Sequence, residues 1–325
     1  MKAIRFHEIG EPEVLRLEDV PDPTPPPGAV LIRVRAIGIN YADTRFRRGA
    51  YFVTPKFPQI PGMEVAGEIA ALGDGSAGVA VGDRVMALCA DAYAEYVVAR
   101  PHDLYPIPDG MDFATAAALP AQGLTAHHLL GLAGRLQRGE RVLVHAAAGG
   151  VGTLLVQLAR LAGASQIFGT AGGPDKCALV RELGADVAID YKSENFAERV
   201  NQASAGAGAD VILEMLGGAE VMKKNLACLA AFGRLVVYGA ASGDLRATLL
   251  PVSLMPKNQS VIGYYLTPLT RRRELCAPAL AEVAAHVVAG RVRVVIGARL
   301  PLRDAAEAHR RMESRGSTGK LVLEP

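Results

Sequence analysis

A glycine-rich turn near the middle of the chain has the residue types that bind phosphate groups through backbone atoms. Its residues, Ala147-Ala148-Gly149-Gly150-Val151-Gly152, join an apolar stretch that predicts a strand at 141–146 to a periodic stretch that predicts a helix at 151–162. Backbone amides and the positive end of a helix can face a pyrophosphate at such a turn. In the GxGxxG pattern of dinucleotide sites, Ala147 replaces the first glycine, and a turn that binds no ligand is the alternative.

The next strand, expected at 166–170, bears on which dinucleotide would bind. Sites for NAD have an acidic residue at the end of this strand, which holds the ribose hydroxyls. Here the strand continues into Ala171-Gly172-Gly173, with Lys176 within reach and no carboxylate in the turn. An adenosine 2′-phosphate would be tolerated there and would pair with the lysine. The turn therefore favours NADPH, unless Lys176 is only a solvent-facing helix residue.

Strands and amphipathic helices alternate from about residue 123 to residue 262, which predicts βαβ units and a parallel sheet. The flanking segments, 1–122 and 263–325, have short strand patterns interrupted by proline and glycine, and predict a second, mostly-β domain. The nucleotide-binding α/β domain is therefore expected as an insertion. Further strands are expected at 29–36, 64–71, 83–89, 92–99, 187–189, 211–214, 233–238, 292–296 and 320–323, and further helices at 175–183 and 272–289.

The bulk composition excludes several classes of protein. The 325 residues are 50% hydrophobic and 21% charged, as in globular proteins, and the net charge of +2 is spread evenly, so no nucleic-acid or anionic-membrane surface is expected. No apolar run has the length of a membrane span, and charges interrupt residues 1–8, so we expect no signal peptide and a cytoplasmic protein. The four cysteines form no CxxC pair and are expected to stay reduced.

With these features the sequence resembles the medium-chain dehydrogenase/reductase superfamily, and within it the zinc-free NADPH:quinone oxidoreductases related to zeta-crystallin. The likeness covers nearly the whole chain. It implies an α/β protein in which a Rossmann-type, doubly wound parallel sheet domain at 123–262 is inserted into a mostly-β GroES-like catalytic domain at 1–122 and 263–325. The stretches that carry it are Phe6, GEPEVL (10–15), GINYADT (38–44), RG (48–49), Tyr51, PGMEVAG (61–67), VGDRV (81–85), HAAAGGVG (145–152) and GSTGK (316–320).

The positions of zinc ligands in related alcohol dehydrogenases hold other residues in this chain. Those enzymes bind a catalytic zinc through Cys, His and Cys, and the resemblance places Asn40, Met63, and Ala121 or Gln122 at these positions. Glu64 remains, but one carboxylate cannot hold a catalytic zinc, which needs about three protein ligands. The four-cysteine loop of a structural zinc site is also missing. We therefore expect an enzyme without metal.

The resemblance also implies which residues contact the cofactor. Two lie beside the nicotinamide, three hold the adenosine end, and a run after the Tyr238 strand lines the nicotinamide pocket, while the glycine-rich turn holds the pyrophosphate. The nicotinamide candidates are Asn40 and Thr125, the adenosine candidates are Lys176, Tyr191 and Arg315, and the pocket candidates are Tyr238, Gly239 and Ser242. The pyrophosphate candidates are Gly149, Gly150, Val151 and Gly152, and two further cofactor candidates are Ala148 in the same turn and Thr170 at the end of the next strand.

Three side chains are candidate donors to the oxygen of a hydride acceptor: Asn40, Arg45 and Tyr51. Related quinone reductases often have a tyrosine where Arg45 stands, and a cation there would favour a more anionic or carbonyl-rich acceptor. Alternatively, Arg45 pairs with Asp43 or faces water, and Tyr51 is a loop aromatic packed on the core. His145, inside a buried strand, is interpreted as a core histidine with satisfied hydrogen bonds rather than a proton relay.

A metal-free site can deliver hydride to an electron-poor acceptor, because such an acceptor spreads the arriving negative charge onto its oxygen, where hydrogen-bond donors can stabilise it. The leading hypothesis is therefore NADPH-dependent reduction of quinones. The alternatives are reduction of the activated C=C bond of an enone, alkenal or enoyl thioester, and a non-catalytic NADPH-binding protein with a sensor or RNA-binding role. The resemblance implies a homodimer joined edge to edge through the sheet, around the apolar segment 260–263.

Overall fold

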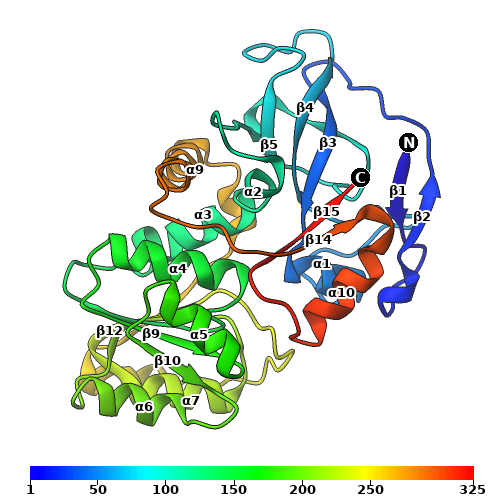
Figure 1. Cartoon of the computed structure of the whole chain (residues 1–325). Helices are drawn as coiled ribbons and strands as arrows, with labels where there is room; N and C mark the ends of the chain where they lie inside the picture. The colour runs from blue at the N-terminus through cyan, green and yellow to red at the C-terminus, as the bar shows by residue number, and fades with distance from the viewer. The chain divides into compact units, whose positions relative to one another are not determined.

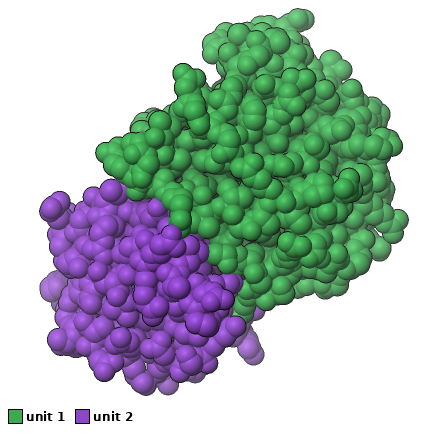
Figure 2. Space-filling model, viewed as in Figure 1, with its two compact units in different colours: residues 1–124, 269–325 green, residues 125–268 purple.

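The computed structural model describes residues 1–325, and the chain forms two compact units. The first contains residues 1–124 and 269–325, and the second contains residues 125–268 (Figure 2). The chain thus leaves the first unit once and returns to it once. The roles expected from the sequence, catalysis for the first unit and dinucleotide binding for the second, stay predictions.

The second unit is built on a six-stranded parallel sheet with the order β10-β9-β8-β11-β12-β13. One half runs outward from β8 to β10 and the other from β11 to β13, so the direction of winding reverses between β8 and β11. This is the doubly wound arrangement that binds nucleotides at the carboxyl ends of its central strands. The strands are β8 (Arg141–Val144), β9 (Gln166–Ala171), β10 (Val187–Asp190), β11 (Ala209–Glu214), β12 (Leu229–Val237) and β13 (Ser260–Gly263).

Helices cover both faces of this sheet. Figure 1 shows α4 and α5 on one face and α6 and α7 on the other. Because both faces are covered, the strands are apolar along their whole length, and Leu143, Phe168 and Leu235 are fully buried. The helices are α4 (Gly150–Leu161), α5 (Pro174–Glu182), α6 (Phe196–Ala203) and α7 (Ala219–Cys228), with a π-helical turn (Leu129–Ala133) and a 3₁₀ segment (Pro251–Lys257). Two further helices, α3 (Pro120–His128) and α8 (Leu266–Leu269), cross the boundaries at which the chain enters and leaves this unit.

The first unit contains a mostly antiparallel seven-stranded sheet, with the order β14-β15-β3-β4-β5-β7 and β6 paired with β3. Its long strand β3 alternates as the sequence predicts, since Ile32 and Val34 are buried while Arg33 and Arg35 are exposed. The strands are β1 (Lys2–Arg5) and β2 (Arg16–Asp19), which form a separate pair, and β3 (Val30–Gly38), β4 (Glu64–Leu72), β5 (Arg84–Leu88), β6 (Tyr96–Ala99), β7 (Leu104–Pro106), β14 (Ile296–Pro301) and β15 (Lys320–Glu324).

Two expected strands of this unit differ from the structure. In the segment 92–99 the chain bends at Tyr93 and Glu95, and the strand β6 begins only at Tyr96 and pairs with β3, while Ala94 forms a single bridge with Ala3. The segment 292–296 is irregular, and β14 begins only at Ile296. A β-carbon at Gly297 would lie 1.8 Å from the Thr318 carbonyl oxygen, so the pairing with β15 starts at a bulge that the apolar pattern did not reveal.

The helices of the first unit are short apart from α9 (Arg273–Val288), which confirms the helix expected at 272–289. The others are α1 (Tyr41–Arg47), α2 (Phe113–Ala117) and α10 (Ala305–Glu313), with 3₁₀ turns at Pro12–Val14, Pro101–Asp103 and Leu302–Asp304. None of the helices of the chain is both long and apolar enough to cross a bilayer. The four cysteines are unpaired, as expected.

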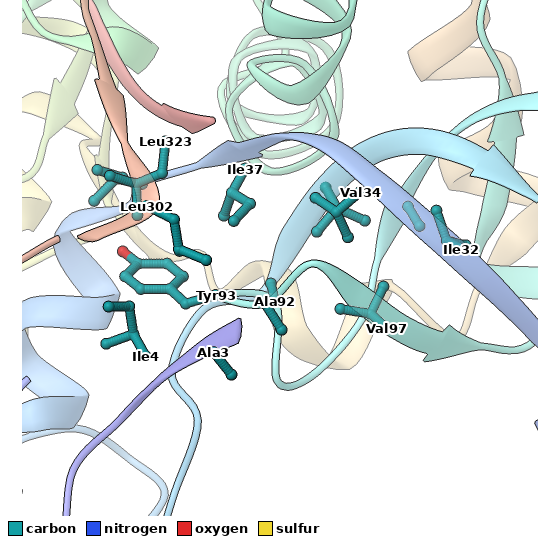
Figure 3. Packing of buried hydrophobic residues seen from close by; sticks show 14 of the residues in the cluster. Ala3, Ile4, Ile32, Val34, Ile37, Ala92, Tyr93, Val97, Leu302 and Leu323 are labelled. Carbon is teal, nitrogen blue, oxygen red and sulfur yellow. The ribbon is translucent and has the colours of Figure 1, made fainter. Parts of the chain in front are cut away.

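The core of the first unit packs residues from distant parts of the chain against one face of β3 (Figure 3). The Tyr93 ring lies among these apolar side chains while its hydroxyl makes hydrogen bonds, so a polar atom is placed at the edge of the core. The residues labelled in the figure are Ala3, Ile4, Ile32, Val34, Ile37, Ala92, Tyr93, Val97, Leu302 and Leu323.

Candidate functional site

The glycine-rich turn follows β8 at the point where the winding of the parallel sheet reverses. Gly149 caps α4, whose first turn presents the free backbone amides of a helix N-terminus. A β-carbon at Gly152 would lie 2.3 Å from the Ala146 carbonyl oxygen and 2.6 Å from the Ala147 α-carbon. Only glycine therefore allows α4 to pack this closely on the turn.

The residue in the left-handed conformation in this turn is Ala146, with a φ of 48°, and not Ala147 at the first glycine position. Ala147 is fully buried, and its N–H donates to the Thr170 carbonyl oxygen at 2.8 Å. The turn is therefore tied to the end of β9. An alanine fits the first position because that residue has ordinary backbone geometry here.

A buried hydrogen-bond network supports the turn from below. His145 Nε2 donates to the Asn225 amide oxygen at 2.8 Å, and His145 Nδ1 accepts from the Thr170 hydroxyl at 3.1 Å. The Asn225 amide donates in turn to Glu214, whose other oxygen accepts the Gly217 N–H at 3.0 Å. His145, Glu214 and Asn225 are at most 1% exposed. The interpretation of His145 as a satisfied core histidine is confirmed.

The expected adenosine end lies at the turn between β9 and α5. A β-carbon at Gly172 would lie 2.7 Å from the Tyr191 hydroxyl and 3.3 Å from Lys192 Cε, so both side chains lie over this turn. Burial and the charge of Lys192 both lower the pKa of Lys176, which places two lysines within electrostatic reach of each other. Neighbouring positive charges raise the local concentration of anions at this turn.

Sequence reasoning missed two residues at this turn, Lys192 and Asp190. Lys192 follows Tyr191 directly, but only the fold brings it beside Gly172. Asp190 is an acidic residue at the end of the neighbouring strand β10. Its Oδ1 accepts the Gly173 N–H at 3.0 Å and the Lys192 N–H at 3.1 Å. The carboxylate is thus used to hold the backbone of the turn.

The candidate nicotinamide residues of the second unit lie on paired loops after β11 and β12. The Tyr238 N–H donates to the Glu214 carbonyl oxygen at 2.8 Å, and the Ser242 N–H donates to the Leu216 carbonyl oxygen at 2.8 Å. A β-carbon at Gly239 would lie 3.0 Å from the Met215 carbonyl oxygen, so this glycine lets the loops approach. Thr125 is a half-buried residue of α3.

Asn40 of the first unit lies in a buried cluster of charged groups. It precedes α1 and is 8% exposed, and its Nδ2 donates to Glu64 Oε1 at 2.8 Å. The Lys320 ammonium donates to Asn40 Oδ1 at 3.0 Å and forms an ion pair with Glu64. Glu64 Oε2 accepts the Ala121 N–H at 2.7 Å. No local pattern in the sequence indicated that Lys320 belongs to this cluster.

A series of hydrogen bonds connects Asn40 with buried polar groups of the core. Asp43 Oδ2 accepts the Asn40 N–H at 2.8 Å and the Tyr93 hydroxyl at 3.1 Å, and the Tyr93 oxygen accepts from His309 Nε2 at 3.0 Å. His309 Nδ1 accepts from Arg47 at 3.1 Å, which fixes the tautomer of the imidazole. Burial raises the pKa of Asp43 to about 7, while burial and the charge of Arg47 lower the pKa of His309 to about 3.

The two other candidate donors lie near Asn40 in sequence. Arg45 is half-buried in α1, and no ion pair joins it to Asp43, whose carboxylate faces Asn40 and Tyr93 instead. The alternative in which Arg45 pairs with Asp43 is therefore wrong. Tyr51 is half-buried, and its ring packs against Phe52 at a centroid distance of 5.4 Å. Arg315 has a left-handed backbone after α10.

Comparison with known proteins identifies the family. Residues 26–109 match the alcohol dehydrogenase GroES-like domain, and residues 183–323 match the zinc-binding dehydrogenase domain. Human quinone oxidoreductase is 36% identical over 99% of this chain and 97% of its own. The chain belongs to the zinc-free quinone oxidoreductase branch of the medium-chain dehydrogenase/reductase superfamily. Its fold is that of the superfamily, a Rossmann-type unit inserted into a GroES-like unit.

Two solved structures of this family match the whole chain. The Escherichia coli quinone oxidoreductase complexed with NADPH has a TM-score of 0.94 and 30% identity, and covers 100% of both chains. A mycobacterial protein complexed with NADPH has a TM-score of 0.93 and 36% identity, also over 100% of both chains.

The description of one matching domain implies zinc, and the residues at the expected position do not fit that ion. Both oxygens of Glu64 are engaged, one by Asn40 and Lys320 and the other by the Ala121 N–H. The ammonium of Lys320 already neutralises the carboxylate. Within residues 1–325, no three His, Cys, Asp or Glu side chains are grouped to hold a metal.

The opposite pKa shifts of Asp43 and His309 predict how stability depends on pH. The raised pKa of Asp43, against an ordinary value of 3.8, stabilises the fold below pH 4, and this contribution is lost as pH rises through 7. The lowered pKa of His309, against 6.5, stabilises the fold above pH 6.5, and this contribution is lost as pH falls through 3. Between pH 4.5 and 6 the pH dependences of these two contributions cancel, because folding moves a proton from His309 to Asp43 and leaves the number of bound protons unchanged.

Replacing one of these two residues should therefore reveal the pH dependence of stability that the other one causes. Relative to the wild type, the free energy of unfolding of Asp43→Asn should rise with pH by up to about 1.4 kcal/mol per unit, and that of His309→Gln should fall by a similar amount. Urea unfolding at several pH values from 4.5 to 6 measures both slopes. Slopes parallel to that of the wild type in both variants would contradict the assignment.

Proposed function

We propose that this protein reduces quinones by transfer of hydride from NADPH, without a metal ion. The observation that carries the proposal is the Asn40–Glu64–Lys320 cluster, which offers a hydrogen-bond donor where a metal would otherwise polarise the substrate. An amide donor stabilises charge on an oxygen but cannot ionise a plain alcohol. An acceptor that is already electron-poor suits such a site. The names of the relatives, quinone oxidoreductases, support this class of acceptor.

The proposed cofactor contacts follow the residues expected from the sequence, with one addition. The turn at 147–152 holds the pyrophosphate, and Lys176, Tyr191 and Arg315 hold the adenosine end, where Lys192 adds a second positive charge for a 2′-phosphate. Bound NADPH supplies the hydride. The remaining proposed contacts are Asn40, Thr125, Tyr238, Gly239 and Ser242 around the nicotinamide, together with Ala148 in the glycine-rich turn and Thr170 in β9.

The proposed acceptor site uses Asn40, with Arg45 and Tyr51 as further donors. Hydride adds to the conjugated quinone, the π electrons shift so that negative charge develops on a carbonyl oxygen, and these donors stabilise that charge. A proton from solvent and aromatisation of the ring then give the hydroquinone. The balanced reaction is NADPH, quinone and one proton giving NADP⁺ and hydroquinone.

A steady-state panel tests the proposed reaction. Quinones, 2-alkenals and a crotonyl thioester are each assayed with NADPH and NADH, and simple alcohols with NADP⁺ and NAD⁺, before and after treatment with a chelator. We expect 1,4-benzoquinone with NADPH to give the highest kcat/KM and the chelator to change nothing. A faster alkenal or thioester would identify a C=C reductase, tight NADPH binding without turnover would identify a non-catalytic protein, and loss of activity with chelator would contradict the metal-free mechanism.

Replacing Lys176 tests the choice of cofactor. Lys176→Ala should weaken NADPH binding by about 10- to 100-fold, because a charge-assisted bond to the 2′-phosphate is lost, and should leave NADH binding within about 2-fold. Dissociation constants from fluorescence titration of both cofactors measure the difference. Lys223→Ala, on α7, is the matched control. Equal losses for NADPH and NADH would contradict the role given to Lys176.

We also propose that the protein is a homodimer joined through β13. This strand is the edge of the parallel sheet and pairs only with β12, so one row of its backbone groups is open to a second strand. The segment before it carries large exposed apolar side chains, which a second copy would cover. They are Leu245, Leu250, Val252 and Met255.

A charged residue on β13 should break this dimer. Ile262→Asp places a carboxylate on the open edge, and sedimentation should show the mass falling from twice 34.1 kDa to that of one chain. Leu132→Asp, which changes an exposed apolar side chain outside β13, serves as the control and should stay dimeric. A wild type that sediments as a single chain would contradict the proposal at once.

A further inference from the structure

Lys320 places a positive charge inside the first unit, in direct contact with Asn40. Its side chain is 1% exposed, and that of its partner Glu64 is fully buried. Burying two charges costs several kcal/mol per ion before their attraction is counted, so a pair of this kind is rarely present for stability alone. A role of the pair other than stability has to involve the residue that it contacts, Asn40.

The pair fixes the orientation of the Asn40 side chain. Glu64 can only accept hydrogen bonds and Lys320 can only donate them, so the Asn40 amide must turn its nitrogen to Glu64 and its oxygen to Lys320. The reverse orientation would set oxygen against carboxylate and an amino group against ammonium. With one N–H held by Glu64, the other N–H of Asn40 is the donor left for a ligand.

The surrounding backbone is shaped to hold the pair in place. A β-carbon at Gly38, the last residue of β3, would lie 2.4 Å from Glu64 Oε1 and 2.4 Å from the Ala117 carbonyl oxygen, so only glycine leaves room for the carboxylate. The second carboxylate oxygen is held by the Ala121 N–H at 2.7 Å. Lys320 begins β15, and its own N–H donates to the Val295 carbonyl oxygen at 2.8 Å.

We propose that Lys320 is a positioning residue for hydride transfer: paired with Glu64, it fixes and polarises the Asn40 amide so that its free N–H donates to the acceptor oxygen on which negative charge develops. The inference rests on the proposed function. A cation on the amide oxygen draws electron density away from the amide nitrogen and strengthens its N–H as a donor. Lys320 is not the source of the proton that neutralises the acceptor, which comes from solvent.

The test removes both charges together, since removing one would leave the other buried without a partner. In the variant Glu64→Gln/Lys320→Met, the amide oxygen introduced at position 64 can still accept the Ala121 N–H, and the amide nitrogen introduced there then faces Asn40. The Asn40 oxygen turns towards that nitrogen, so its own N–H no longer points where it did. Turnover of 1,4-benzoquinone should fall roughly 10- to 100-fold in kcat, less than the roughly 100- to 1,000-fold for complete loss of an oxyanion donor because the Asn40 N–H is misdirected and not removed, while the Kd for NADPH stays within about 3-fold.

A double-mutant cycle separates positioning from a merely structural role. In an Asn40→Ala background, adding the two replacements should reduce kcat no further, because Lys320 acts through Asn40. Losses that multiply, or an unchanged kcat in the variant with Asn40 intact, would overturn the inference. Arg141→Met/Asp210→Asn neutralises a partly buried ion pair at the start of β8 and is the control, with kcat expected to be unchanged.

A measurement on the unaltered protein covers the case in which the variant fails to fold. With asparagine labelled by ¹⁵N, binding of NADP⁺ and hydroquinone should shift one of the two side-chain amide protons of Asn40 and leave the one held by Glu64 in place. Shifts of both protons, or of neither, would overturn the inference. Absence of NADPH oxidation by any quinone, or an Asn40→Ala variant with full kcat, would instead show that the proposed function itself is wrong.

Discussion

The ion pair between Lys320 and Glu64 sets the geometry of the first unit around the candidate site. Both groups are removed from water, so every oxygen and proton they carry has to meet a partner inside the protein. That requirement joins β15, β4, the residue before α1 and the start of α3 at one point. A buried charge pair tolerates little displacement, because each lost contact leaves a desolvated group unpaired.

In the second unit, the buried polar groups beside the glycine-rich turn are neutral or anionic and form a hydrogen-bond network in place of an ion pair. The network contains His145 after β8, Thr170 in β9, Glu214 at the end of β11 and Asn225 in α7. Its hydrogen bonds connect the glycine-rich turn with the loop after β11. Buried networks of this kind rigidify the backbone when every member is satisfied. In both units, then, polar groups buried beside the candidate site fix backbone atoms that a ligand would meet.

The sequence allowed the parallel sheet to be predicted nearly strand by strand, because strands buried on both faces are continuous apolar runs separated by periodic helices. The antiparallel unit was predicted less well: the segment 292–296 has an apolar pattern, yet a bulge at Gly297 delays β14. The glycine-rich turn could be recognised in the sequence because its residues are adjacent. Lys320 was not, since 256 residues separate it from Glu64 and no local pattern links them. Lys192 was missed for the related reason that only the fold brings it over Gly172.

The chemistry of the cluster limits what this protein can reduce. A metal ion stabilises charge on oxygen by several kcal/mol and can ionise an alcohol, whereas one oriented N–H is worth about 3–4 kcal/mol in a dry site. The smaller contribution suffices only when the acceptor already spreads the arriving charge, as a conjugated carbonyl does. A cation held on the far side of the Asn40 amide raises that contribution without touching the substrate. In the proposed role, the buried pair provides part of the charge stabilisation that a metal ion provides, and its limited strength favours quinones and other conjugated acceptors over unconjugated aldehydes and ketones.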